Sequence, residues 1–71
     1  CLVAAAYLEN GVATSEEVEF SFSGAPERAY KATYLGNNAY RIQCFNASRN
    51  PLVITVSAHD TTDTMSIRLY P

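Results

Sequence analysis

The chain has 71 residues, of which 48% are hydrophobic and 17% are charged, with a formal net charge of −2 at pH 7. This length allows one small domain, and the scattered Lys and Arg residues exclude the concentrated basic patch that nucleic-acid binding needs. The longest apolar run, residues 2–8, is far shorter than the about 20 residues that cross a bilayer as a helix.

The first segment contains good helix formers. Residues 2–10 lack Pro and Gly, and Asn10-Gly11 follows as a typical helix end. We therefore predict a short helix or a tether at residues 1–16. Residues 17–71 are then predicted to form a single small domain.

The segment at residues 25–35 fits two structures. Pro26 lies where helices accept proline, and Glu27 and Lys31 have the i,i+4 spacing that stabilises a helix. These features predict a helix. The alternative is a strand in which three side chains share one face: Tyr30, Ala32 and Tyr34.

Alternation of apolar and polar residues predicts the remaining elements as strands. The predicted strands are residues 17–23, 40–44, 52–58 and 65–69. The last three are joined by short connections, which predicts an antiparallel meander. Four side chains are expected on one buried sheet face: Phe20, Ile42, Ile54 and Ile67.

Together these elements predict an α+β fold. A short N-terminal helix or tether precedes β-α-β-β-β, and one helix packs on a four-stranded, mostly antiparallel sheet. If residues 25–35 form a strand, the alternative is an all-β five-stranded sheet or small barrel.

Few residue patterns in the chain point to chemistry. His59 is the single histidine, and Asp60 and Asp63 lie close to it, as metal ligands could. An Asp-rich and Thr-rich segment between two strands is equally typical of a turn, and a triad of Ser57, His59 and Asp60 would need its members to come from separate segments. We therefore predict no catalytic, metal or cofactor site, and no enzyme.

Cys1 allows three interpretations. It could form a disulfide with Cys44, which would stabilise a small core by roughly 4 kcal/mol in the chain-entropy model. It could carry the lipid of a mature bacterial lipoprotein, which begins at its lipidated cysteine. It could also mark a fragment boundary. Lipidation of Cys1 is the prediction, and the disulfide between Cys1 and Cys44 is the alternative.

The order of segments resembles a family of small uncharacterised bacterial lipoproteins. The resemblance lies in Cys1, the alanines at residues 4–6, the segment at residues 26–33, and Thr64-Met65-Ser66-Ile67-Arg68. It implies a membrane anchor on Cys1 and a place in the cell envelope, at the outer membrane or in the periplasm; Leu2 favours the outer membrane. It implies no activity.

The predicted function is therefore a non-enzymatic, envelope-associated binding or structural module. The alternative is a small secreted inhibitor or immunity-type protein that docks on a protein partner. A protein partner or a homo-oligomer is expected in either case. Neither a cofactor nor nucleic acid is expected.

Overall fold

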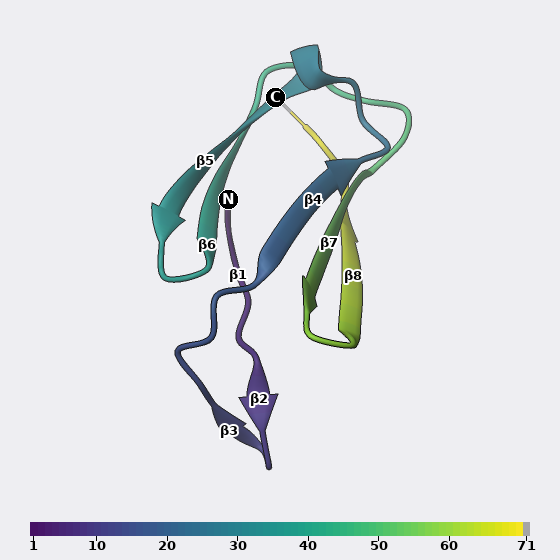
Figure 1. Ribbon diagram of the computed structural model, residues 1–71. Coiled ribbons are helices and arrows are strands. Elements are labelled where there is room, and N and C mark those ends of the chain that lie inside the picture. Colours follow the sequence, from purple (N-terminus) through teal and green to yellow (C-terminus); the bar gives the residue numbers. More distant parts are fainter. Residues whose placement is uncertain (71) are drawn as a thin grey trace.

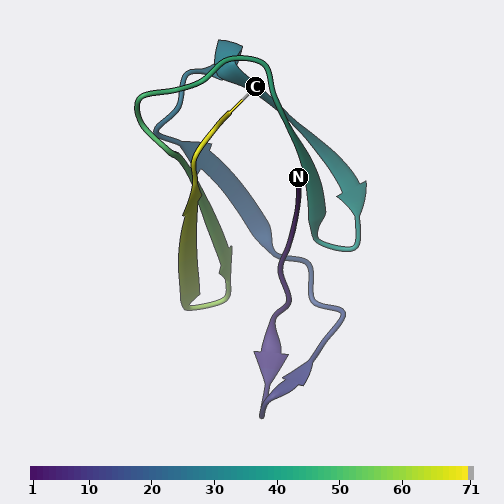
Figure 2. The same ribbon diagram turned by 180° about the vertical axis from the view of Figure 1, so that it is seen from behind.

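The computed structural model describes residues 1–70. The chain is nearly all β, with 56% of its residues in strands and 4% helical. It forms two three-stranded antiparallel sheets and a separate two-stranded hairpin. The two sheets face each other across a small core, and the short helical turn lies at the end where they come together (Figures 1 and 2).

The first sheet has the strand order β1-β6-β5. Its strands are β1 (Leu2–Ala4), β6 (Ala39–Cys44) and β5 (Tyr30–Gly36). Val3 lies opposite Tyr40 in the β1–β6 register, so the first residues of the chain are part of this sheet. Three consecutive residues with positive φ, Gly36, Asn37 and Asn38, turn the chain from β5 into β6.

The second sheet has the order β4-β7-β8. It contains β4 (Glu19–Ser23), β7 (Leu52–Ala58) and β8 (Thr61–Ile67). Ala58 pairs with Thr61, so His59 and Asp60 alone make the turn between β7 and β8. Within residues 1–70, β8 has one neighbouring strand, and its other edge is free.

The hairpin of β2 (Leu8–Glu9) and β3 (Val12–Ala13) projects from the two sheets (Figure 1). Asn10 and Gly11 join its strands with φ values of 52° and 79°. Positive φ at both positions is the requirement of a type I′ hairpin turn, which Asn-Gly meets best. The helical turn η1 (Glu27–Ala29) precedes β5 directly.

The core lies between the sheets. Its buried members are Val3, Ala29, Ile42, Leu52, Ile54 and Leu69. Aromatic rings from both sheets close it, since Phe20 and Phe22 of β4 contact Tyr40 of β6 with ring centroids 4.8 and 5.1 Å apart. The strands are short, so these few side chains supply most of the apolar burial that holds the sheets together.

The predicted α+β fold is wrong. The structure has neither a helix packed on a sheet, within residues 1–70, nor the single five-stranded sheet or barrel of the alternative. Residues 25–35 form η1 and β5, because one turn at Glu27–Ala29 is followed by the alternation of Tyr30, Ala32 and Tyr34. One Glu–Lys pair contributes less than the cross-strand packing of that face.

The N-terminal prediction is wrong as well. Residues 1–16 are neither a helix nor a tether, because Leu2–Ala4 form β1 and Val3 is only 7% exposed. Hydrogen bonds join the amino group of Cys1 to the carbonyl of Ile42 and the amide of Ile42 to the carbonyl of Cys1, both at 2.8 Å. Pairing with β6 therefore overrides the helix propensity of the alanines.

The predicted meander is also wrong. β6 and β7 belong to different sheets, because residues 45–51 cross from one to the other. The four side chains expected on one face approach the core from both sheets. Ile42 and Ile54 are buried, whereas Phe20 and Ile67 are partly buried. β7 and β8 do form the expected antiparallel pair, although β8 begins at Thr61 rather than at Met65.

Candidate functional site: an open groove between the sheets

An apolar groove of about 500 Å³ lies between the N-terminal segment and the second sheet. Residues 3–8 form one wall, and Val18 with side chains of β4, β7 and β8 forms the other. The apolar lining of the second wall comprises Val18, Phe20, Ile54, Val56, Ala58 and Met65. The groove is the side of the sandwich that the two short sheets leave uncovered.

β8 forms the rim of this groove. Its residues are exposed from Thr61 to Ser66, and Met65 keeps 48% of its surface exposed although it lies opposite the buried Ile54. In an antiparallel hairpin, residues alternate between pointing their N–H and C=O groups at the partner strand and away from it. Ala58 and Thr61 close the turn, so the backbone groups of Thr62, Thr64 and Ser66 point to the free edge.

Of the described residues that line the groove, Asp63 alone carries a charge. It lies opposite Val56 in the sheet register, on the groove side of β8. Its Oδ1 accepts a hydrogen bond of 2.9 Å from the amide of Thr64, one of the amides at the free edge. Within residues 1–70, no Lys or Arg pairs with this carboxylate, because the one ion pair there joins His59 and Glu16.

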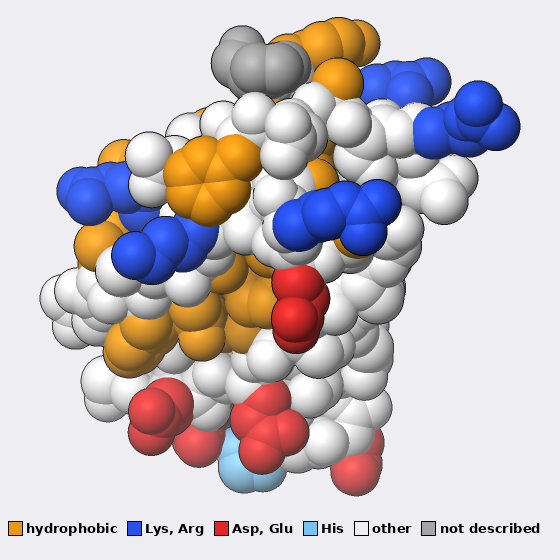
Figure 3. Space-filling view, turned by 90° about the horizontal axis from the view of Figure 1, so that it is seen from above, with side chains coloured by type: hydrophobic (Ala, Val, Ile, Leu, Met, Phe, Trp, Pro, Cys, Tyr) orange, Lys and Arg blue, Asp and Glu red, His pale blue; other side chains and the backbone are white. Residues whose placement is uncertain are grey.

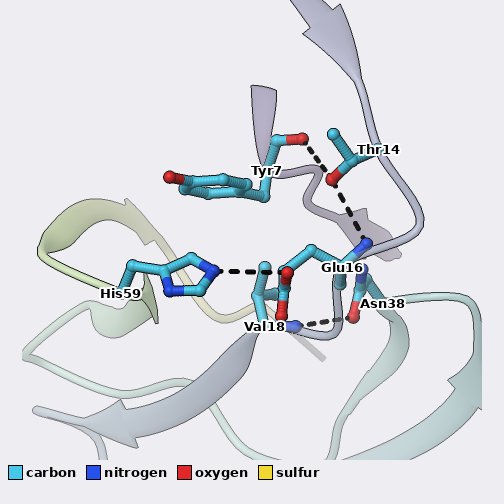
Figure 4. Close-up of polar contacts among 6 residues, drawn as sticks. All are labelled: Tyr7, Thr14, Glu16, Val18, Asn38 and His59. Atoms are coloured by element: carbon cyan, nitrogen blue, oxygen red, sulfur yellow. Dashed lines mark hydrogen bonds and ion pairs between the residues drawn. The ribbon is translucent and has the colours of Figure 1, made fainter. Parts of the chain in front are cut away.

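Polar contacts hold the end of the groove beside the β7–β8 turn (Figure 4). His59 Nε2 lies 3.2 Å from Glu16 Oε1, and the centroid of the imidazole ring lies 5.0 Å from the centroid of the Tyr7 ring. Thr14 donates its hydroxyl to the carbonyl of Tyr7 at 2.9 Å. The side chain of Asn38 accepts from the amide of Val18 and donates to the carbonyl of Glu16. These contacts fix the N-terminal wall against both sheets.

We expect His59→Ala to lower the free energy of unfolding by less than about 1 kcal/mol, since exposed ion pairs contribute little. His59 and Glu16 keep 57% and 43% of their side-chain surfaces exposed. Urea denaturation of the two chains checks this expectation. A loss of several kcal/mol would show that the contact of His59 with Tyr7 and Glu16 holds the groove wall in place.

Most charged side chains are divided between the two ends of the molecule; the exceptions are Arg41 in the middle of β6 and Glu27 in η1. Arg28, Lys31, Arg49 and Arg68 lie at the end that carries η1, where β5 begins and β8 finishes (Figure 1). Glu16, Glu17, Glu19, Asp60 and Asp63 lie toward the other end, where β4 and β8 begin. Seen from the η1 end, apolar side chains lie between basic groups on one side and acidic groups with the histidine on the other, and an acidic group also lies beside the basic ones (Figure 3).

The residues singled out from sequence do not meet in one reactive site. His59 and Asp60 form the turn, Asp63 lies in β8, and within residues 1–70 no three His, Cys, Asp or Glu side chains gather as metal ligands would. Ser57 and His59 flank a small polar cavity with three glutamates, Glu16, Glu17 and Glu19.

Cys1 directly precedes β1, Cys44 ends the neighbouring β6, and both border the same open cleft, apart from the groove. Both thiols are free, and the sulfur of Cys44 donates to the carbonyl of Asn46 at 3.3 Å. Cys1 is opposite Ile42, so Cys44 is its diagonal rather than its direct neighbour. Lipidation of Cys1 and the alternative disulfide both stay predictions.

Comparison of the chain with protein-family models, curated proteins and solved structures finds no match in any of the three. The resemblance to small bacterial lipoproteins therefore stays a prediction. Among residues 1–70 no helix has the length and apolar character that crossing a membrane requires.

Sequence analysis missed the groove, because residues 3–8 of one wall meet β7 and β8 of the other wall only through the fold. One signal was present in β8. Thr61, Thr62, Asp63 and Thr64 are polar on both faces of the strand, which is typical of a strand that covers little of a core.

Proposed function

We propose that this chain is a non-enzymatic protein-binding domain that accepts an extended segment of a protein partner. The segment would add to the free edge of β8 and place alternate side chains in the groove. This mode of recognition takes its affinity from main-chain hydrogen bonds and its specificity from pockets for every second side chain.

One observation carries the proposal: the free edge of β8 borders the apolar groove. The backbone groups of Thr62, Thr64 and Ser66 supply the hydrogen bonds, and Met65 and Val56 supply the apolar contact. A long, exposed edge strand attracts other strands unless the protein covers or charges it. Here the edge is seven residues long, and Asp63 carries the single charge on it.

The energetics favour a modest affinity. Each net hydrogen bond contributes about 0.5–1.5 kcal/mol, and each buried aliphatic side chain contributes about 1.5–3 kcal/mol. Ordering an extended peptide offsets much of this gain. We therefore expect a dissociation constant in the micromolar range for a short segment.

The test uses a fluorescent nine-residue peptide that alternates valine with glutamine. We expect it to bind the full chain and to protect the amides of Thr62, Thr64 and Ser66 from hydrogen exchange. A scrambled peptide without the alternation should bind weakly. Two further peptides carry N-methyl groups on either the odd-numbered or the even-numbered amides. One of them should fail to bind and the other should bind normally, because only alternate amides of the peptide face β8.

A matched pair of variants tests the groove. Met65 and Leu35 are similarly exposed, at 48% and 44%, but Leu35 lies on β5 outside the groove. Met65→Ser should weaken peptide binding about tenfold, since an apolar contact is lost, and Leu35→Ser should leave it unchanged. Equal effects of the two substitutions, or protection on a different strand, would contradict the proposed site.

A further inference from the structure

We propose that Asp63 makes the groove selective for an extended segment that carries a Lys or Arg among its groove-facing side chains. This inference rests on the proposed function and names the chemistry of the partner. The segment would place apolar side chains against Met65 and the core, and its cation against Asp63.

The position of Asp63 supports this assignment. The carboxylate is the one charge among the groove residues that the structure describes, and the neighbouring lining of Val56, Phe20 and Val18 is apolar. A partner strand on β8 would partly remove Asp63 from water, and an unpaired carboxylate there would weaken binding. A cation on the partner satisfies the carboxylate with a charge-assisted hydrogen bond, which is stronger than a neutral one.

The surroundings strengthen the same preference. Glu16, Glu17, Glu19 and Asp60 lie at the end of the molecule where β8 begins, whereas Arg28, Lys31, Arg49 and Arg68 lie at the other end and Arg41 lies in the middle of β6. His59 lies between Glu16 and Tyr7 and leaves the other acidic groups of this end unpaired within residues 1–70. The potential at this end of the groove therefore attracts a basic segment and repels an acidic one.

A second copy of this chain fits the same edge poorly. If two β8 strands paired about a two-fold axis, the register that keeps all seven residues would centre on Thr64. Asp63 would then lie opposite Met65 of the other copy, and a shift that centres the axis on Asp63 would oppose two carboxylates. The first register does bring Asp60 beside Arg68, but an exposed pair of this kind contributes little.

Asp63 also covers part of the edge in the free chain. Its Oδ1 accepts a hydrogen bond from the amide of Thr64, and this amide is the central donor that an added strand would need. A cation that draws the carboxylate away would free this amide for the incoming backbone. An inward-pointing charge that limits unwanted strand pairing is a known device of edge strands, and here it would be released by the correct partner.

The experiment scans the valine–glutamine peptide, replacing one valine at a time with lysine and measuring affinity for the full chain by fluorescence anisotropy. Glutamine and glutamate are placed at the same positions for comparison. At one position toward an end of the peptide, the lysine peptide should bind about tenfold more tightly than the glutamine peptide, and the glutamate peptide should bind most weakly. Asp63→Asn should remove this order. Glu27→Gln, the same change of charge at the far end, should keep it.

The outcomes separate this inference from the proposed function. Lysine, glutamine and glutamate peptides that bind equally, or an order that persists in Asp63→Asn, would overturn the selectivity and leave the binding site. Failure of every peptide to bind would overturn both. Sedimentation equilibrium tests whether a second copy occupies the edge. If the chain is a dimer and Ser66→Pro makes it a monomer, a second copy pairs with β8, contrary to this inference.

Discussion

Removing residues 1–4 is expected to lower the free energy of unfolding by about 3–6 kcal/mol. The deletion takes Val3 out of the core and breaks the two hydrogen bonds between Cys1 and Ile42. It also exposes one edge of β6 and removes part of the groove wall. Small domains have little stability in reserve, so much of the shortened chain should be unfolded at room temperature. Urea denaturation followed by far-ultraviolet circular dichroism measures the difference.

The projecting hairpin provides the control. Residues 8–13 are exposed throughout, and β2 and β3 pair with each other alone. Replacing these six residues with a flexible linker should therefore cost far less stability than deleting residues 1–4, which are Cys1 and β1. Measurements with and without reductant separate packing from a disulfide, because both thiols are free in the structure. A loss seen only without reductant would mean that a bond between Cys1 and Cys44 provides the stability.

Gly24→Ala is the substitution expected to be most damaging among the glycines, with a cost of about 3–5 kcal/mol. Gly24 has a φ of 90°, and an added Cβ would lie 2.5 Å from the carbonyl oxygen of Pro51. The Cβ is fixed rigidly to the backbone of residue 24 and the oxygen belongs to the backbone of Pro51, so the end of β4 would have to move away from the start of β7. Chemical denaturation and the amide spectrum of residues 52–54 report the loss and its location.

Two other glycines provide a comparison that separates the steric clash at Gly24 from the cost of placing a side chain at positive φ. Gly11 and Gly36 have φ values of 79° and 89°, but an added Cβ at either would meet no atom within 4 Å. Gly11→Ala and Gly36→Ala should each cost about 1–2 kcal/mol, the penalty for a side chain at positive φ. If Gly24→Ala costs no more than these two, the approach of Gly24 to Pro51 does not constrain the fold.

Strand positions followed well from sequence where apolar and polar residues alternate. The strand predicted at residues 52–58 coincides with β7, and the one at residues 40–44 lies within β6. Alternation reports that one face of a strand is buried, but it does not say which strand is the neighbour. The alternation therefore predicts β6 and β7 as strands, but it does not show that residues 45–51 separate them into two sheets.

The N-terminal error has a specific cause. Asn-Gly ends helices and also makes type I′ hairpin turns, and the alanines before it favour a helix. The deciding interaction is between Val3 and β6, which lies almost forty residues further along the chain. The groove was unpredictable for the same reason, since residues 3–8 and Asp63 meet only through the fold.

The long separation between β1 and β6 has a kinetic consequence. Cys1 and Ile42 are 41 residues apart, whereas β5–β6 and β7–β8 are local hairpins. Closing a long loop costs more conformational entropy than closing a hairpin, which slows the contacts between residues far apart in the chain. We therefore expect the two hairpins and their packing to form the folding nucleus and β1 to dock after the rate-limiting step. Val3→Ala should then accelerate unfolding and leave the refolding rate nearly unchanged. The wall that completes the groove would be the last part of the domain to assemble and the first to open.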